Sequence, residues 1–229
     1  MKKCVCYCMT RNIYGNILPS LKSLLKHNDI DQVYLLTEDD DIGFWLPANV
    51  KCINVAGQEF FTESGPNYHC RWTYMVMMRT VLCRIFQEES RMLALDLDTI
   101  IEGDISGLWD LPLDNYCMAA AREQFRHVNG RPYVNCGVVM WNLDRMRNGW
   151  ADVIVKGLNS KQYDYCEQDC INELMQGQIF LMDSAYNTCE YTEPPQSSVK
   201  IRHYAAWGAE NFLADSTVKK YGDMDWSEV

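Results

Sequence analysis

Long apolar runs and an excess of positive charge are both missing from this sequence. Its longest stretch without a polar residue covers residues 4–9, far short of the ~20 residues that a membrane-spanning helix needs and of the roughly 7–15 residues of a secretory apolar segment. Lys and Arg number 21 against 31 Asp and Glu, a net charge of −10. We therefore expect a cytoplasmic protein with no membrane span, at most peripheral membrane contact, and no nucleic-acid partner.

The cysteine pattern lacks what a disulfide framework or a zinc site requires. There are 11 cysteines, an odd number, and no secretion signal accompanies them. Cys4, Cys6 and Cys8 alternate along an expected strand, while Cys166 and Cys170 lie four apart in an expected helix, unlike the paired turns of structural zinc sites. We expect buried free thiols, because reduced cysteine packs as a small hydrophobe.

The composition is that of an ordinary folded protein. The chain has 229 residues, 48% of them hydrophobic and 23% charged, which suits a single domain. No internal repeat is present. We expect residues 1–229 to form one domain, with residues 211–229 as a variable C-terminal tail.

Strand and helix patterns alternate along the chain. The opening order of strand, helix and strand predicts a right-handed crossover and a parallel sheet, which places the protein in the α/β class. A long loop is expected at residues 57–68. Helices are expected at residues 16–26, 72–88, 144–158 and 167–177, and strands at residues 3–9, 32–36, 50–55, 92–95, 116–121, 137–141, 179–182 and 199–204.

The most informative segment is Asp96-Leu97-Asp98, directly after the apolar strand at residues 92–95. A buried strand ending in carboxylates is costly unless a partner neutralises them, and ligands bind at the carboxyl ends of strands in open α/β sheets. Residues two apart point the same way, so both carboxylates could bind one Mg²⁺ or Mn²⁺ carrying a diphosphate. The alternative is a solvated turn in which Asp98 caps a following helix.

A phosphatase of the haloacid-dehalogenase type also carries Asp-x-Asp after a buried strand. Lys219, Lys220, Asp223 and Asp225 could stand for its later motifs. That fold normally begins with the nucleophile strand, whereas 95 residues precede Asp96 here, so this reading is the weaker one. A nucleotidyltransferase would need a Gly-rich, Lys-bearing loop after the first strand, and residues 8–14 contain none.

Five blocks, in their order and spacing over residues 4–207, resemble the family 8 glycosyltransferases, the group of glycogenin and the bacterial lipopolysaccharide galactosyltransferases. Taken singly, each block has a structural explanation, such as a surface arginine, a core histidine or a turn asparagine. The blocks are Arg79, seventeen residues before Asp96; the Asp-x-Asp segment 95–101 with Gly103-Asp104-Ile105 and Leu108-Trp109; Tyr133-Val134-Asn135-Cys136-Gly137-Val138; Glu167-Gln168-Asp169 with Asn172; and Ile201-Arg202-His203-Tyr204.

The resemblance implies a GT-A fold, a Rossmann-like single domain with a mostly parallel central sheet flanked by helices. It implies a metal-dependent, retaining transfer of a hexose from a UDP-sugar to a hydroxyl on a glycan, a lipid-linked glycan or a protein. Mn²⁺, or Mg²⁺, would be the cofactor. The metal ligands would be Asp96, Asp98 and His203.

The resemblance also assigns roles around the donor. Catalysis would involve Gln168 beside the anomeric carbon, Glu167, and Arg79, which would orient an aspartate or sugar hydroxyls. Tyr14 would stack on uridine near Thr10. The whole donor-binding set would be Thr10, Tyr14, Arg79, Asp96, Asn135, Cys136, Glu167 and Gln168.

The expected mechanism follows from the chemistry of the residue at the sugar face. Gln168 carries an amide, which is a feeble nucleophile, whereas a stable glycosyl–enzyme intermediate normally needs a carboxylate. We therefore expect departure and attack on the same face of the sugar, with the leaving diphosphate accepting the acceptor's proton. Glu167 is the fallback nucleophile.

Two positions depart from the family pattern. The family's histidine strand usually runs on to a Gly and then Lys-Pro-Trp, but residues 204–209 here contain no lysine; Lys219 or Lys220 could substitute. Arg11 stands where the family often has Asp in its nucleotide-binding turn. The missing lysine leaves an alternative open, a non-catalytic sugar-nucleotide or glycan binder with the same fold.

Overall fold

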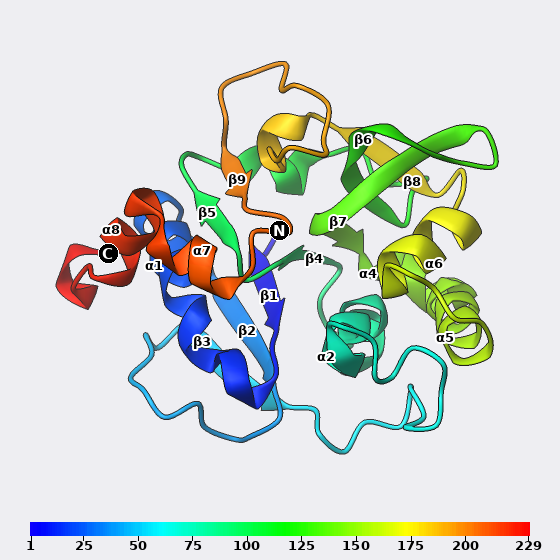
Figure 1. Ribbon diagram of the computed structural model, residues 1–229, viewed down its shortest axis with the longest axis horizontal. Helices are drawn as coiled ribbons and strands as arrows, with labels where there is room; N and C mark the ends of the chain where they lie inside the picture. Colours follow the sequence, from blue (N-terminus) through cyan, green and yellow to red (C-terminus); the bar gives the residue numbers. More distant parts are fainter.

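The computed structural model describes all residues, 1–229, around one seven-stranded sheet (Figure 1). The strand order is β3-β2-β1-β4-β7-β6-β8. Only β7 runs against the other strands, so the predicted mostly parallel sheet is confirmed. The strands are β1 (Cys4–Cys8), β2 (Gln32–Thr37), β3 (Val50–Asn54), β4 (Arg91–Leu95), β6 (Met118–Val128), β7 (Arg131–Asn142) and β8 (Ile179–Met182).

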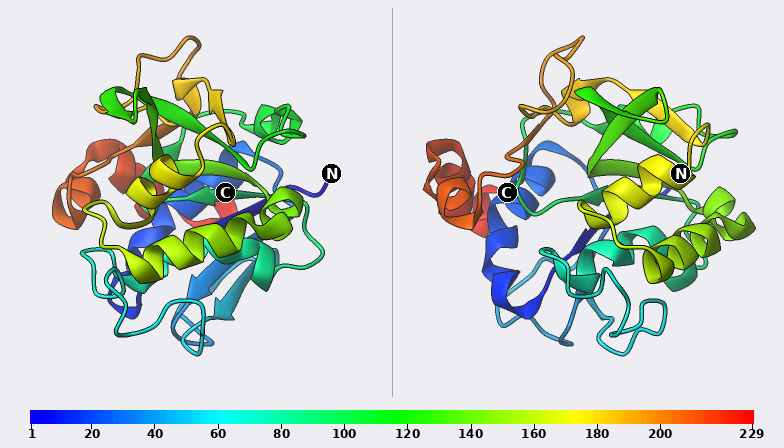
Figure 2. Two further views of the ribbon diagram at one scale, coloured as in Figure 1. Left: turned by 90° about the vertical axis from the view of Figure 1, so that its right-hand side faces the viewer. Right: turned by 45° about the vertical axis from the view of Figure 1, so that its right-hand side comes forward.

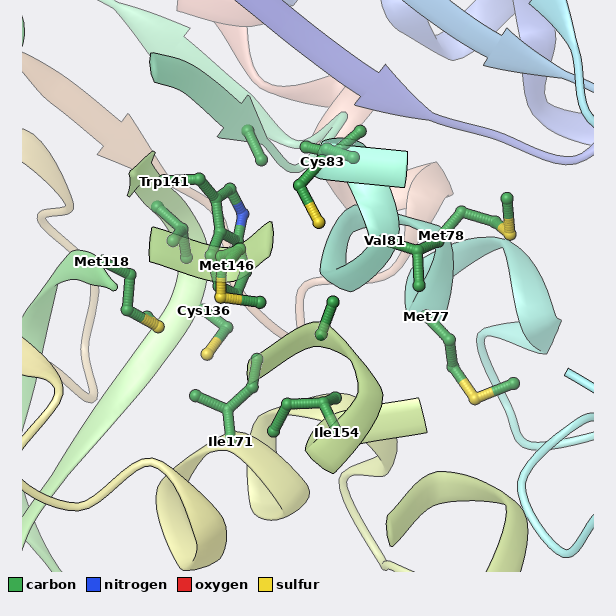
Figure 3. Close-up of a cluster of buried hydrophobic side chains, with 14 of the residues drawn as sticks. Met77, Met78, Val81, Cys83, Met118, Cys136, Trp141, Met146, Ile154 and Ile171 are labelled. Atoms are coloured by element: carbon green, nitrogen blue, oxygen red, sulfur yellow. The ribbon is translucent and has the colours of Figure 1, made fainter. Parts of the chain in front are cut away.

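Helices cover both faces of the sheet, as the α/β reading predicts. Helix α1 (Ile17–His27) buries Ile17, Leu21 and Leu24 on one face. A second core on the other face is enclosed by four helices, α2 (Thr73–Met77), α3 (Leu82–Ile85), α5 (Ala151–Ser160) and α6 (Cys166–Leu174). The two groups stand on opposite sides of the sheet in Figures 1 and 2. Figure 3 shows the second core, which is rich in methionine and contains Trp141. Because β1 lies between two parallel neighbours, it is apolar almost throughout.

The expected helix over residues 72–88 is broken into three pieces. They are α2 (Thr73–Met77), a 3₁₀ turn (Met78–Val81) and α3 (Leu82–Ile85). Within the turn, the Thr80 hydroxyl donates to the carbonyl of Met77 at 2.8 Å, and such back-bonding together with a β-branched neighbour disturbs a regular helix. The 3₁₀ turn carries Arg79 in its buried part.

The expected helix over residues 144–158 is also irregular. It consists of α4 (Leu143–Arg145), a wide turn (Met146–Trp150) and α5 (Ala151–Ser160). Gly149 has φ +97° in the wide turn, a conformation that only glycine adopts easily. The next helix, α6 (Cys166–Leu174), lies close to its predicted range.

Strands β6 and β7 form a long hairpin that extends beyond both predicted strands. Asn129 and Gly130 form its turn with φ of +51° and +74°. Asn-Gly is a sequence signal for a tight hairpin, and the strand ranges predicted above did not take it into account. Ala121 pairs with Asn135 while Ala120 pairs with Val139. The hairpin therefore has a bulge over residues 136–138, and bulges commonly redirect side chains beside active sites.

A second, two-stranded sheet joins distant parts of the chain. β5 (Thr99–Ile101) pairs antiparallel with β9 (Ile201–His203), so Thr99 lies opposite His203. A strand therefore follows Asp98, and the alternative of a capped helix at that point is wrong.

The C-terminal segment is helical. α8 (Ser216–Gly222) lies beside α1, and α7 (Ala209–Ala214) packs against α8; the two helices are orange and red in Figure 2. Phe212, Val218 and Tyr221 pack with Ile100 and Tyr204 in a small core of their own. All 11 cysteines are free, and most are buried, as predicted. None of the helices combines the length and the apolar character that crossing a bilayer would demand.

Candidate active site

Asp96, Asp98 and His203 meet at the carboxyl end of β4. The antiparallel pairing of β5 with β9 brings the C-terminal histidine to the two carboxylates, more than 100 residues away in the chain. His203 Nε2 lies 3.3 Å from Asp98 Oδ1 and 3.6 Å from Asp96 Oδ2. One ligand atom from each residue falls within 4.8 Å of the other two, which is the predicted convergence.

Gly137 gives the His203 ring its space. A Cβ at this position would lie 2.1 Å from His203 Cε1 and 2.5 Å from Nδ1, so no side chain fits without moving the ring. The Gly137 carbonyl also accepts the backbone N–H of Asp96 at 2.8 Å. The bulge in β7 therefore positions both the imidazole and the first carboxylate.

The charges at this cluster suit a divalent cation. Burial disfavours a charged His203, but the carboxylates of Asp98 and Asp96 outweigh it and raise the pKa of the imidazole well above 6.5. Burial also opposes ionisation of Asp98, yet His203 keeps the pKa of that carboxyl below its usual value. The side chains of Asp96 and Asp98 are 32% and 35% exposed, whereas that of His203 is 4% exposed. Two accessible carboxylates and one imidazole form a donor set that fits Mn²⁺ or Mg²⁺.

Arg79 lies behind the first carboxylate and is 3% exposed. One guanidinium nitrogen donates to Asp96 Oδ1 and another to the Cys136 carbonyl at 2.6 Å. Its Nε is 3.8 Å from Glu167 Oε1 and has no hydrogen-bond partner. Arg79 thus links the end of β4, strand β7 and the start of α6. Burial opposes a charged guanidinium, but the carboxylates of Asp96 and Glu167 outweigh it and raise the pKa of Arg79 above its ordinary value.

Glu167 is the most perturbed carboxyl group in the site. It is 4% exposed, and burial raises its pKa to about 8, although the neighbouring Arg79 works in the opposite direction. At neutral pH a substantial fraction of Glu167 is therefore protonated. A buried carboxyl group with a raised pKa among other charged residues is typical of functional sites.

Gln168 is tied to the β6–β7 hairpin by its amide. Its Oε1 accepts the backbone N–H of Cys136 at 2.9 Å. Its Nε2 donates to the hydroxyl of Tyr133 at 3.1 Å and to Glu123 Oε1 at 3.3 Å. The amide is therefore held in one orientation, beside Glu167 and at the edge of the same cluster.

Two further polar residues, Glu123 and Asn187, belong to the cluster and were not predicted. Asn135 donates to Glu123 Oε1 at 3.2 Å and accepts from Asn187 Nδ2 at 2.9 Å. Burial raises the pKa of Glu123, which is 4% exposed. The Asn-Gly turn signal would have extended β6 over Glu123; no pattern marks Asn187, which lies in the loop between β8 and β9.

Cys136 contributes its backbone rather than its thiol. The thiol lies in the methionine-rich core near Met118 and Ile171, as Figure 3 shows, and burial raises its pKa well above the ordinary value. Both polar atoms of its peptide are used, the N–H by Gln168 and the carbonyl by Arg79.

The end of β1 lies at the same sheet edge, because β1 pairs with β4. Tyr14 is 8% exposed; its hydroxyl donates to Asp39 at 3.0 Å and accepts the N–H of Glu38 at 2.8 Å. Arg11 makes two hydrogen bonds, of 2.6 and 2.7 Å, to the carboxylate of Asp39. Thr10 donates to the side chain of Asn12 at 2.7 Å. Arg11 stands where the family often has an aspartate, and Asp39 places a carboxylate directly beside that position.

The turn directly after His203 contains no lysine. Ala206 and Gly208 turn the chain with φ of +64° and +74° into α7. Lys219 and Lys220 are exposed on α8, which packs against α1.

Comparisons with known proteins agree with this geometry. The family described as Glycosyl transferase family 8 matches residues 4–207. Glycosyltransferase GlyE of Streptococcus pneumoniae serotype 4 is 25% identical over 181 residues, which cover 73% of this chain and 43% of that protein. Glycosyltransferase GlyB of the same organism is 31% identical over 104 residues, covering 44% and 26% respectively. The chain thus spans less than half the length of these curated relatives.

Solved structures share the fold. An active-site mutant of LgtC has a TM-score of 0.72 at 19% identity, over 92% of this chain and 94% of that chain. The galactosyltransferase LgtC solved with donor and acceptor sugar analogues has a TM-score of 0.66 at 18% identity, over 98% of both chains. The GlyE structure has a TM-score of 0.72 at 20% identity, over 99% of this chain and 62% of that one. The predicted GT-A fold is confirmed.

Proposed function

This chain belongs to glycosyltransferase family 8, and on that premise we propose that it transfers a hexose from a UDP-sugar to a hydroxyl acceptor with retention at the anomeric carbon. The observation that carries the proposal is the cluster of Asp96, Asp98 and His203 at the carboxyl end of β4, with Arg79 buried behind it. Family membership also removes the phosphatase alternative.

Asp96, Asp98 and His203 would hold one divalent cation, Mn²⁺ or Mg²⁺. A bound cation would act as a Lewis acid that offsets the charge building on the departing diphosphate. Arg79 keeps the Asp96 carboxylate in place by a charge-assisted hydrogen bond. The partial exposure of both carboxylates leaves the cation side of the site open to a ligand.

The donor sugar would lie against the β6–β7 bulge and the start of α6. Asn135 and Glu167 are proposed to bind sugar hydroxyls, Gln168 to face the anomeric carbon, and the Cys136 peptide to orient Gln168 and Arg79. The uridine would lie at the end of β1 near Thr10 and Tyr14. Tyr14 supports that proposal by its place at the same sheet edge, although its hydroxyl is already bonded to Asp39.

The reaction would proceed on one face of the sugar. The bond from the anomeric carbon to the diphosphate oxygen breaks, the acceptor oxygen bonds to the same face, and the acceptor's proton passes to the departing diphosphate. Two features support this over a covalent intermediate. Gln168 is an amide whose oxygen already accepts a backbone N–H, and the raised pKa of Glu167 makes it a poor nucleophile at neutral pH.

The test is release of UDP from UDP-glucose and UDP-galactose with Mn²⁺, measured with and without added sugar, lipid-linked and peptide acceptors. We expect UDP release that falls at least ~100-fold in Asp98→Asn, because one of three cation ligands is lost. Asp110→Asn, a change at an exposed aspartate outside the site, should retain full activity. No UDP release from any sugar nucleotide would contradict the proposal.

The missing lysine after His203 favours one second candidate, a sugar-nucleotide binder without turnover. In that case UDP-sugars with Mn²⁺ would raise the melting temperature, yet UDP would not be released in the presence of acceptors. A ligand at 100 times its Kd stabilises a protein by about 2.7 kcal/mol, which a thermal-shift panel readily detects. Release of UDP would exclude this candidate.

A further inference from the structure

Asn187 contacts the side of the His203 ring that faces away from the two carboxylates. Asn187 Oδ1 lies 2.9 Å from His203 Nδ1, while Nε2 of the same ring faces Asp98 and Asp96. Asn187 is fully buried. One ring nitrogen is therefore available to a cation, and the other is engaged by an amide.

The hydrogen-bond network determines which atom of that amide faces the ring. The backbone N–H of Gly137 can only donate, and it bonds to Asn135 at 3.0 Å, so the Asn135 atom there is its oxygen. The other Asn135 atom, Nδ2, then donates to Glu123 Oε1. Asn187 approaches the same Asn135 oxygen at 2.9 Å, so it must present its NH₂ group there.

The consequence reaches His203. If the NH₂ group of Asn187 points to Asn135, its oxygen points to His203 Nδ1 and can only accept. We propose that Asn187 is a positioning residue: when a divalent cation takes the place of the Nε2 proton of His203, Asn187 keeps the remaining ring proton on Nδ1, so that the Nε2 lone pair binds the cation. This inference rests on the metal site of the proposed function. It assigns the Gly137 peptide, Asn135 and Asn187 to one chain of hydrogen bonds that ends at His203, which we call the relay.

The backbone around Asn187 keeps the relay in place. The Asn187 carbonyl accepts from the Thr192 hydroxyl at 2.9 Å, and its N–H donates to Ser184. Thr188 is bonded through its backbone both to Ile201 and to His203. Because β9 and the Asn187 loop are joined in this way, the amide and the imidazole keep their relative position without any ligand.

The direct test is the tautomer of His203, read from imidazole ¹⁵N chemical shifts in long-range ¹H–¹⁵N spectra. The chain has only 4 histidines, so His203→Gln assigns the signal. With Mg²⁺ alone as the diamagnetic probe, we expect Nδ1 to be protonated and Nε2 to be unprotonated. A protonated Nε2 with a bare Nδ1 in the metal-bound protein would overturn the proposal.

Variants give a second readout in the binding of Mn²⁺ alone, followed by the electron paramagnetic resonance signal of the free ion. Asn187→Leu, which removes the acceptor, should weaken Mn²⁺ binding by about 10–100-fold, as loss of a partner behind a metal ligand does. Asn187→Asp retains an acceptor and should keep the Nδ1–H form. Cys189→Ser changes another neighbour of the ring and should leave the tautomer unchanged.

Unchanged Mn²⁺ affinity and an unchanged His203 spectrum in a folded Asn187→Leu protein would contradict the proposal. If Asn187→Leu does not fold, the wild-type tautomer and Asn187→Asp still decide the question. No sugar nucleotide enters either measurement, so an Nδ1–H tautomer without any glycosyl transfer would contradict only the proposed function. Transfer with the opposite tautomer would contradict only the relay.

Discussion

At the scale of single residues, Gly137 is the position where the site tolerates least change. Gly137→Ala would place a Cβ 2.1 Å from the His203 ring. We expect a loss of about 1–3 kcal/mol in unfolding free energy from overpacking, together with weaker Mn²⁺ binding because the imidazole is displaced. Urea unfolding and a Mn²⁺ titration measure the two effects. Gly57→Ala, whose new Cβ meets nothing within 4 Å, is the matched control; equal behaviour of the two variants would contradict this account.

Arg79 is a buried cation that lies beside two carboxyl groups, Asp96 and Glu167. Arg79→Met should cost about 3–5 kcal/mol of stability, because removing one partner of a buried ion pair leaves its neighbours unpaired. Arg84→Met breaks a surface pair with Asp152 instead and should cost less than about 1 kcal/mol. Chemical unfolding of both variants tests the difference, and similar losses would show that Arg79 is not a buried link.

The raised pKa of Glu167 predicts that the stability of the protein depends on pH. Its pKa is raised by burial from 4.5 to about 8, so between these values the folded protein holds a proton that the unfolded chain has released. Stability contributed by the protonated group is complete below pH 4.5 and is lost as the pH rises towards 8. Glu167→Gln should therefore lose less stability than the wild type between pH 5 and pH 8, measured by urea unfolding without metal. A parallel decline in both proteins would contradict the shifted pKa.

At the scale of elements, the strands were more predictable than the helices. β8 has its predicted bounds, and β1, β2, β3 and β4 differ from theirs by a residue or two. For β1, β2 and β4 the reason is burial, because buried parallel strands are nearly continuous apolar runs. The helices at residues 72–88 and 144–158 were predicted to be regular. The spacing of apolar residues shows which face of a helix is buried, but it does not show whether the turns of the helix are regular. Thr80 in one and Gly149 in the other break them locally.

The β6–β7 hairpin depends on its turn. Gly130 has φ +74° with open space around its Cβ position, so Gly130→Ala tests conformation alone. We expect a loss of about 1 kcal/mol, the cost of a left-handed conformation for a residue with a Cβ. Thermal unfolding against Gly57→Ala measures it. A stabilised Gly130→Ala protein would contradict the turn geometry.

At the scale of the whole molecule, the order of the five blocks predicted the fold and the meeting of Asp96, Asp98 and His203. Those residues belong to recognisable segments: Asp96 and Asp98 directly follow β4, and the pairing of β5 with β9 brings His203 to them. Asn187 and Glu123 could not be found in this way, because one lies in an unpatterned loop and the other in a strand whose length was underestimated. The helical packing of residues 209–222 was likewise invisible, since its small core forms only against Ile100 and Tyr204.

The charge of the molecule bears most directly on the metal. The protein carries a net charge of −10, and the site itself contains Asp96 and Asp98, so a diphosphate would be repelled without a cation. We predict that isothermal titration calorimetry with UDP-glucose and UDP-galactose will give a Kd at least about 100-fold lower with Mn²⁺ than with EDTA, about 2.8 kcal/mol, and that Asp98→Asn will remove the difference. Equal affinity with Mn²⁺ and with EDTA would contradict the claim that Asp96, Asp98 and His203 bind the donor through a divalent ion.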